Sequence, residues 1–274
     1  MDAILDLIQA YEEDGFVLMA EVFSAAEIAC LKQRLPTLAI EDSPRRVVEK
    51  DGVSVRSVYG PHLTDSLFNR LTRDKRILDP VRRIIGRDTY IHQTKVNFKK
   101  GFSGDVWAWH QDYIFWLKED GVPKPELITA VVYLDEVTEF NGPLFLIPGS
   151  HKESVIDLDA DETALADYRG SPSWISSLTA DLKYSIPKDG IERLIRSRGV
   201  VAPRGAAGSV LFFHPNIVHA SPSNILPFDR ALVLITYNSV DNKPVGTRRQ
   251  RPEFLCGREF SAVRPDASTC LSMD

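Results

Sequence analysis

The sequence predicts an α+β protein in which a helical opening is followed by a succession of β-strands. Hydrophobic residues recur at helical spacing mainly before residue 88, alternating or continuous apolar runs dominate afterwards, and Gly and Pro turn signals separate those runs. The chain has 274 residues, 43% of them hydrophobic, and contains no internal repeat or linker-like tract. We therefore expect one domain over 1–274, with a helical support at 1–88 and a strand-rich core at 89–255.

The same patterns place the individual elements. Helices are expected at 2–13, 24–38 and 76–86, with Ser24 as the N-cap of the second, because its hydroxyl can accept a hydrogen bond from a free backbone N–H. A short strand over Phe16-Val17-Leu18 separates the first two helices. Further strands are expected at 89–98, 106–113, 127–134, 144–147, 209–213 and 230–238. Turn signals lie at Asn141-Gly142-Pro143 and Pro148-Gly149.

Two segments do not follow the strand pattern. Residues 153–200 are rich in Asp, Ser, Lys and Arg, with a helical stretch near 190–197, and form either a lid over a binding site or a surface excursion. The loop 242–252 carries four basic residues that either contact a substrate carboxylate or remain solvated: Lys243, Arg248, Arg249 and Arg251.

Composition excludes several classes of function. A net charge of −5 and the lack of a basic stripe argue against a nucleic-acid surface. No apolar run approaches a membrane span, and the first 30 residues lack the features of a signal peptide. The 3 cysteines are scattered and lack metal-binding spacing, which favours a reduced, cytoplasmic protein. We therefore expect a small-molecule substrate, with no nucleic-acid or membrane partner.

The triplet His110-Gln111-Asp112 offers an imidazole and a carboxylate two residues apart. In a strand, residues at this spacing point to the same face, so both side chains would face one cavity. Two imidazoles and one carboxylate are the donor set typical of mononuclear non-haem iron oxygenases. The alternative reading of the triplet is a buried histidine hydrogen-bonded to a nearby carboxylate.

The second imidazole comes from either His214 or His219, and we favour His219 because it follows the turn at Pro215-Asn216. Arg230, eleven residues later, opens the strand at 230–238, and a hairpin-like return would bring it back towards His219. A guanidinium there is suited to the far carboxylate of an oxo-diacid co-substrate. His214 would otherwise be a loop histidine, and Arg230 a surface ion-pair former.

With these residues the chain resembles the phytanoyl-CoA dioxygenase superfamily of Fe(II)/2-oxoglutarate oxygenases, and most of all its ectoine hydroxylase-like amino-acid hydroxylases. The resemblance runs from about residue 90 to about 255. Its most specific blocks are 91–98, Trp109-His110-Gln111-Asp112, Trp116 with Glu119-Asp120-Gly121, Asn141-Gly142-Pro143-Leu144, Ile147-Pro148-Gly149-Ser150-His151 and 224–230. The resemblance implies a jelly-roll core, the double-stranded β-helix of the cupins.

The resemblance also implies roles for single residues. His110, Asp112 and His219 would bind Fe(II), and Arg230, Asn97, Ser221 and Lys95 would bind 2-oxoglutarate, although Lys95 stands where ectoine hydroxylases usually carry arginine. Residues matching the substrate pocket are Gln93, Trp116, Phe213, Leu127 and Leu234. Leu127 replaces a smaller alanine and Leu234 replaces a phenylalanine, so the pocket is expected to hold something other than ectoine.

These observations predict an O2-dependent hydroxylase acting on an unactivated C–H bond of a free amino acid or a small zwitterion derived from one, in secondary-metabolite or compatible-solute biosynthesis. Ectoine, an aliphatic amino acid such as leucine, and a proline-like ring are all compatible with the pocket. Two alternatives stay open: an oxygenase that tailors a larger natural product, and a non-catalytic cupin-type binding protein. The large apolar pocket residues would also be expected in the core of any barrel.

Overall fold

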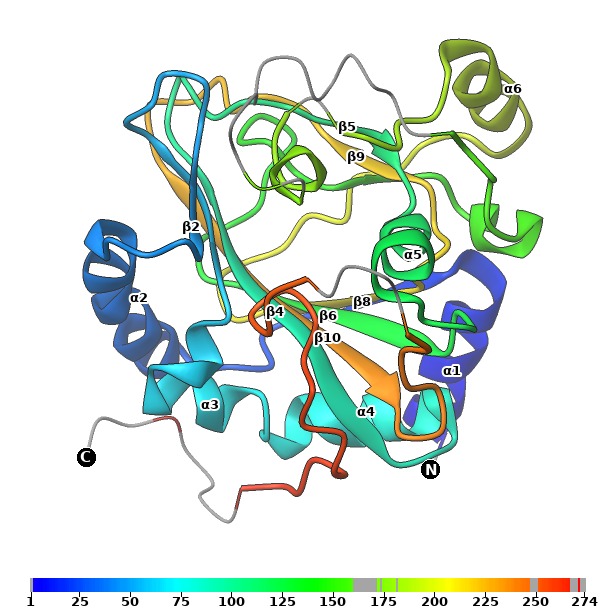
Figure 1. Ribbon diagram of the computed structural model, residues 1–274, viewed down its shortest axis with the longest axis horizontal. Helices are drawn as coiled ribbons and strands as arrows, with labels where there is room; N and C mark the ends of the chain where they lie inside the picture. The colour runs from blue at the N-terminus through cyan, green and yellow to red at the C-terminus, as the bar shows by residue number, and fades with distance from the viewer. Residues whose placement is uncertain are drawn as a thin grey trace.

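Two antiparallel sheets form the centre of the computed structural model, which describes residues 2–159, 172, 174–180, 182–246, 251–266 and 271 (Figure 1). The large sheet has the strand order β1-β8-β6-β10-β4-β3-β2. Its strands are β1 (Phe16–Met19), β2 (Arg46–Val48), β3 (Val55–Tyr59), β4 (Thr89–Lys99), β6 (Leu127–Tyr133), β8 (Val210–Phe213) and β10 (Arg230–Ser239). The small sheet, in the order β5-β9-β7, contains β5 (Trp107–His110), β7 (Phe145–Leu146) and β9 (His219–Ser221). The predicted mainly β, jelly-roll fold is confirmed.

Helices cover the outer face of the large sheet (Figure 1). They are α1 (Asp2–Asp14), α2 (Ala25–Ile40), α3 (Ser66–Leu71), which follows the 3-10 turn η1 (Pro61–Leu63), and α4 (Lys75–Ile85). The three helices predicted from periodicity, at 2–13, 24–38 and 76–86, therefore agree with α1, α2 and α4 to within two residues at each end. Their apolar faces share one core cluster with the outward side chains of the sheet, such as Val233 and Ile235 of β10.

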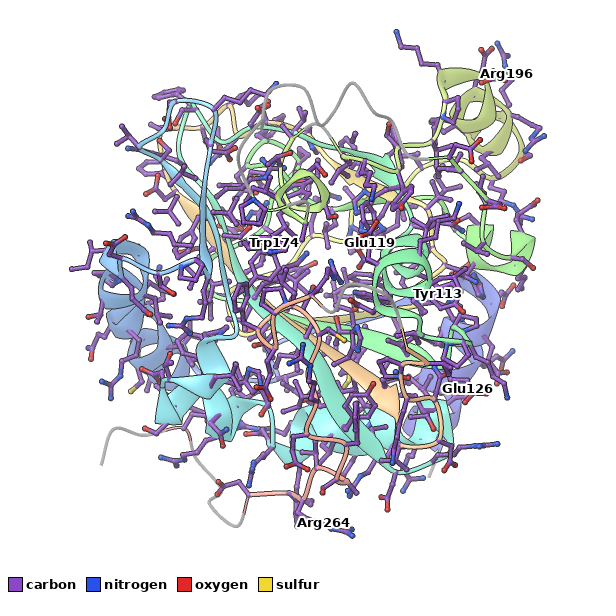
Figure 2. All side chains as sticks on the ribbon, viewed as in Figure 1. Tyr113, Glu119, Glu126, Trp174, Arg196 and Arg264 are labelled. Carbon is purple, nitrogen blue, oxygen red and sulfur yellow. The ribbon has the colours of Figure 1, made fainter. Side chains whose placement is uncertain are left out.

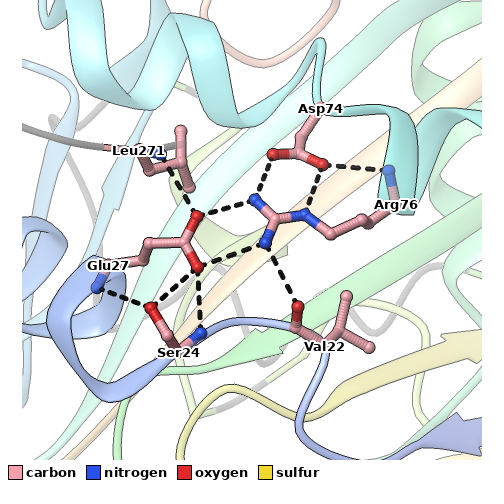
Figure 3. A network of polar contacts seen from close by, with 6 residues as sticks. All are labelled: Val22, Ser24, Glu27, Asp74, Arg76 and Leu271. Carbon is pink, nitrogen blue, oxygen red and sulfur yellow. Dashed lines mark hydrogen bonds and ion pairs between the residues drawn. The ribbon is translucent and has the colours of Figure 1, made fainter. Parts of the chain in front are cut away.

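A network of charges fixes the helices beneath the sheet (Figure 3). Ser24 caps α2 as predicted: its Oγ accepts from Glu27 N, and Glu27 Oε2 accepts from Ser24 N at 2.9 Å, which completes a capping box. The Arg76 guanidinium bridges Glu27 and the N-cap of α4, Asp74. Glu27 Oε1 also accepts from Leu271 N. Burial raises the pKa of Glu27, but Arg76 and Ser24 outweigh it and lower the pKa to about 2.

The period of two along the strands decides which side chains face the space between the sheets. On β10, Leu232 and Leu234 point inward and contact the inner cluster, opposite to Val233 and Ile235. On β4, Lys95, Asn97 and Lys99 line the internal cavity. The register of β4 against β10 shifts where Gln93 pairs with Thr236 and Ile91 with Tyr237. His92 is thus the extra residue of a β-bulge, a feature that redirects side chains.

Two local expectations about the site were wrong. The strand predicted at 106–113 ends at His110, and Asp112 is the first residue of α5 (Asp112–Phe115), which a π-helical turn, η2 (Trp116–Asp120), continues. The hairpin between His219 and Arg230 does not form, because β9 belongs to the small sheet and β10 to the large one. The chain therefore crosses from one sheet to the other between these residues.

The described part of the predicted insert at 153–200 contains η5 (Ile175–Ser177) and α6 (Lys188–Arg198), and follows η3 (Ser150–Glu153). Residues 160–171, 173 and 181 lie outside the described residues. Glu119 of η2 accepts hydrogen bonds from Lys183 Nζ at 2.5 Å and Tyr184 Oη at 2.8 Å, which fastens the insert to this turn. Figure 2 shows Glu119 and Trp174 towards the middle of the view and Arg196 at its edge. Whether the insert closes over the site stays a prediction.

The segment after residue 250 continues along β4. Gly257 N donates to His92 O at 2.7 Å, and Gln93 Nε2 donates to Leu255 O at 2.7 Å. Leu255 is fully buried in a cluster with Val47 and Tyr59. Among the residues that the structure describes, no helix has both the length and the apolar character needed to cross a membrane.

Candidate metal centre and its surroundings

Three side chains from different elements converge in the cavity between the sheets: His110 at the end of β5, Asp112 at the start of α5 and His219 at the start of β9. The ligand-type atoms of all three lie within 4.8 Å of one another. His110 Nε2 lies 3.5 Å from Asp112 Oδ1, and His219 Nε2 lies 3.9 Å from the same oxygen. Pairing of His110 with His219 between β5 and β9 brings the two imidazoles together.

Backbone carbonyls orient both imidazoles. His110 Nδ1 lies 2.6 Å from Ala108 O, and His219 Nδ1 lies 3.0 Å from Ile217 O. Since a carbonyl oxygen only accepts, each Nδ1 must carry the proton, and each Nε2 presents a lone pair towards Asp112. Histidines that bind metals are commonly held in this way through their other ring nitrogen. Two imidazole nitrogens and one carboxylate oxygen at this separation fit a mononuclear iron ion.

Burial and neighbouring charges set the protonation states needed for metal binding. Burial would raise the pKa of Asp112, but the neighbouring His219 and His110 imidazoles and the Lys95 ammonium hold that pKa well below its usual range. Burial, reinforced by His110, lowers the pKa of His219 to about 4. At neutral pH the carboxylate is therefore charged and the His219 ring neutral, as metal ligands must be.

One end of the same cavity carries two buried basic side chains, Arg230 and Lys99. Arg230 is 2% exposed, and its guanidinium donates to the carbonyls of Asn141, at 3.3 Å, and of Gly142. Its cross-strand partner Lys99 is 1% exposed, and its ammonium donates to Pro222 O at 2.8 Å and to Asp105 O. Burial lowers the pKa of Arg230 to about 10, so it stays charged at neutral pH. Burial, Arg230 and Arg56 lower the pKa of Lys99 to about 6.

The other predicted co-substrate residues line this cavity as well. Asn97 Oδ1 accepts from Ser57 Oγ at 2.9 Å, and Ser221 Oγ donates to Gly142 O at 2.9 Å. The Lys95 ammonium lies 5.2 Å from the centre of the Trp107 ring. The cavity thus carries polar donors from the Arg230 end up to the triad.

The predicted substrate residues lie in three different places. Leu234 lines the cavity, and the ring centre of Phe213 lies 5.1 Å from that of His219. Trp116 and Leu127 lie in a separate buried cluster with Tyr113 and Val122, so the structure does not bring them to the cavity wall. Gln93 shares the inward face of β4 but directs its amide N–H to Leu255 O.

His214, the alternative metal ligand, lies apart from the triad. Its Nδ1 accepts from Asn216 N at 3.0 Å, and its ring centre lies 5.1 Å from that of His151. Burial and His151 lower its pKa to about 3. It acts as a structural residue of the turn before β9, as its alternative interpretation held.

A second group of ligand-type atoms belongs to His92, Asp120 and Cys256. Here Arg251 occupies both carboxylate oxygens of Asp120, through Nε and one terminal nitrogen, each at 2.6 Å. His92 Nε2 lies 3.2 Å from the same carboxylate. Arg251, predicted either to touch substrate or to remain solvated, is instead 6% exposed and paired inside the protein, so the guanidinium takes the place that a metal cation would need.

Comparison with known proteins agrees with this geometry. The phytanoyl-CoA dioxygenase family model matches residues 11–231. The chain belongs to the phytanoyl-CoA dioxygenase family. It is 34% identical to an L-proline trans-4-hydroxylase of Streptomyces griseoviridis, with 96% of each chain covered. It is 35% identical to an ectoine dioxygenase of Bordetella parapertussis, with 95% of this chain and 84% of the relative covered.

Solved structures of the family are similar over nearly the whole chain. EctD of S. alaskensis with 2-oxoglutarate and 5-hydroxyectoine superimposes with a TM-score of 0.78 at 32% identity, covering 94% of this chain and 86% of that one. The same enzyme with bound Fe gives a TM-score of 0.74. The epimerase SnoN, at 20% identity and a TM-score of 0.68, shares the fold.

Four residues that line the cavity were missed by the sequence reasoning: Lys99, Trp107, Leu144 and Leu232. The alternation along β4 that places Lys95 and Asn97 inward also places Lys99 inward, so the signal was present. Nothing in the sequence marks Trp107, Leu144 or Leu232 as different from the other apolar residues of a barrel core.

Proposed function

We propose that this protein is an Fe(II)- and 2-oxoglutarate-dependent hydroxylase whose substrate is a free cyclic amino acid, with L-proline the first candidate. The observation that carries the reaction class is the arrangement of one cavity: the His110, Asp112 and His219 ligand atoms lie within 4.8 Å of one another, and Arg230 lines the same space. A binding protein would need no such combination of a metal donor set and a buried guanidinium.

Each cavity residue has a role that follows from its chemistry. His110, Asp112 and His219 would hold the iron, which supplies oxidative decarboxylation of 2-oxoglutarate and oxygen transfer from O2 to a C–H bond. Arg230 would bind the distal carboxylate of 2-oxoglutarate, because a charged guanidinium buried at the end of the cavity matches a carboxylate in shape and charge. Asn97, Ser221 and Lys95 would contact the rest of that molecule.

The choice of L-proline depends on two observations. The chain matches the proline hydroxylase over 96% of both chains, whereas it covers 84% of the ectoine dioxygenase of B. parapertussis. Two positions that match the ectoine pocket carry leucine, and one of them, Leu234, borders the cavity beside the triad. A small aliphatic ring complements a leucine side chain at this position, because burying its CH2 groups against that side chain is favourable.

The test is succinate release from 2-oxoglutarate in air by the Fe(II)-loaded protein, with L-proline, L-leucine, ectoine and the other common L-amino acids as separate substrates. Mass spectrometry of each reaction follows the 16-dalton gain of hydroxylation. We expect succinate and a hydroxylated product in matching amounts with L-proline, and neither with the Asp112→Ala variant. If only ectoine or only leucine is hydroxylated, that compound and not L-proline is the substrate. If no compound gives succinate, the result favours a larger substrate or a binding protein.

The thiols of Cys30 and Cys256 are not in disulfides, which supports action in the reducing cytoplasm. The expected partners of the protein are small molecules, namely 2-oxoglutarate and the amino-acid substrate.

A further inference from the structure

Gln111 stands between two proposed iron ligands, and its carboxamide is used entirely by backbone groups of other segments. The side chain is buried, at 2% exposure for the residue. Nε2 donates to Asn216 O at 2.6 Å and to Ser154 O at 2.9 Å, and Oε1 accepts from Ile156 N at 2.8 Å. A carboxamide has two N–H donors and one acceptor oxygen, so all of its polar groups have partners here. These partners belong to two different segments, the one around Asn216 and the one from Ser154 to Ile156.

The first of these contacts fixes the turn that carries the third ligand. Asn216 lies in the turn that leads into β9, and the next residue, Ile217, supplies the carbonyl that holds His219 Nδ1 at 3.0 Å. Gln111 therefore acts within three residues of His219, from the chain segment that also carries His110 and Asp112. A parallel contact between Tyr113 N and Pro215 O, at 3.0 Å, joins the same two segments.

The other two contacts hold the first residues of the insert. Ser154 has φ +65° and ψ −169°, a conformation that costs a residue with a side chain free energy and is retained only where the surroundings enforce it. Gln111 donates to the carbonyl of this strained residue and accepts from Ile156 N. Lys118 of η2 pairs with Asp157 at 2.6 Å and secures the next part of the segment.

The Gln111 side chain makes these long-range contacts and does not cap the helix that follows it. It is the N-cap residue of α5, where a side chain commonly accepts from the first turn, yet its side chain makes no capping hydrogen bond. The carboxamide is thus directed across the fold, where it joins the ligand-bearing strand, the turn before His219 and the start of the insert.

We propose that Gln111 is a positioning residue for the metal centre, which sets the placement of His219 relative to His110 and Asp112 and couples that placement to residues 154–156 of the insert. This inference rests on the proposed function, since it assumes that the three side chains bind iron. Loss of the carboxamide would leave the carbonyls of Asn216 and Ser154 and the N–H of Ile156 without this partner. The contact to Asn216 is buried, so its loss is the costly one and would release the turn that carries His219.

Two variants test this. Gln111→Met keeps a similar side-chain volume and removes every hydrogen bond, whereas Gln111→Glu keeps the acceptor for Ile156 N and places a carboxylate against two carbonyl oxygens. The matched control is Asn242→Ala. Asn242 is also a buried carboxamide, at 1% exposure, but its partners lie outside the metal cavity: it accepts from Lys124 N and donates to Lys124 O and to the side-chain oxygen of Asn238.

The main measurement is the dissociation constant of Fe(II) without oxygen, together with the visible charge-transfer absorption that appears when 2-oxoglutarate is added. Thermal unfolding is recorded for every variant. Loss of a residue that orients metal ligands typically weakens metal binding about 10- to 100-fold. We expect a loss of this size and an altered absorption band for both Gln111 variants, with unchanged values for Asn242→Ala despite its lower thermal midpoint.

The outcomes separate the two proposals. If the parent protein binds no Fe(II) and forms no succinate, the proposed function is wrong. If the parent binds Fe(II) but both Gln111 variants match it in affinity and absorption, Gln111 has no positioning role and the inference fails. Should Gln111→Met prove insoluble, Gln111→Glu supports or overturns the inference by the same two readings.

Discussion

Asp120→Asn leaves the buried guanidinium of Arg251 without a carboxylate partner. The Asp120 side chain is fully buried and that of Arg251 is 5% exposed, and two hydrogen bonds of 2.6 Å join them. Asparagine has the same shape, so it leaves no cavity and changes only charge and hydrogen bonding. Hydrogen bonds to charged groups contribute roughly 1.5–3 kcal/mol each, and breaking a buried pair by removing one partner costs about 3–5 kcal/mol. We expect a loss of about 3–5 kcal/mol in the free energy of unfolding.

The effect extends to the active site because Arg251 begins the segment that runs along β4. Gln93 Nε2 donates to Leu255 O in this segment, and Gly257 N donates to His92 O. Release of Arg251 therefore loosens the backbone next to a predicted substrate residue. We expect Asp120→Asn to raise the KM for the amino-acid substrate more than the KM for 2-oxoglutarate.

The assay is urea unfolding followed by tryptophan fluorescence, for Asp120→Asn, Arg251→Met and the double variant. Arg251→Met removes the cation and keeps much of the apolar stem, so the double variant buries neither charge. We expect the double variant to cost less than the sum of the single ones by about 2 kcal/mol or more, as contacting residues of a buried pair do. Costs that add to within about 0.5 kcal/mol would show that the two residues act independently and would refute the reasoning.

Further predictions concern the metal, the co-substrate and acid stability. Asp112→Ala removes the carboxylate donor, so Fe(II)-dependent succinate formation should fall to the level of a metal-free control; turnover at the parental rate would contradict the ligand assignment. Arg230→Met should raise the KM for 2-oxoglutarate about 10- to 100-fold, which corresponds to loss of a charge-assisted contact, and an unchanged KM would place the distal carboxylate elsewhere. His62, whose Nδ1 lies 2.6 Å from Thr94 Oγ1, has its pKa lowered from 6.5 to about 4 by burial and by nearby arginines. Because the folded state binds fewer protons than the unfolded state between these values, stability is full above pH 6.5 and falls as the pH drops towards 4, by about 3 kcal/mol from this residue. His62→Leu should lose correspondingly less stability between pH 7 and pH 4 in urea unfolding experiments, and an identical acid profile would exclude His62 as a cause.

The elements that depend on local pattern were predictable. Helical periodicity and the Ser24 capping signal placed α1, α2 and α4, because an amphipathic helix must bury one face wherever it packs. The donor residues His110, Asp112 and His219 were recognisable from residue type and order, since few side chains can supply an iron site. Arg230 was expected at the start of a strand, and it is the first residue of β10.

The tertiary structure decided which partner each of these residues meets. Periodicity reports that a side chain is buried but does not identify the distant segment that covers it, so the pairing of Asp120 with Arg251, 131 residues later, was hidden. The same holds for Gln111, whose partners lie 43 to 105 residues away. The placement of β9 and β10 in different sheets also depends on long-range pairing, and it is this crossing that puts His219 and Arg230 into one cavity. The sequence by itself thus determined the chemistry that the protein carries, and the packing of segments far apart in the chain determined how that chemistry is held in place.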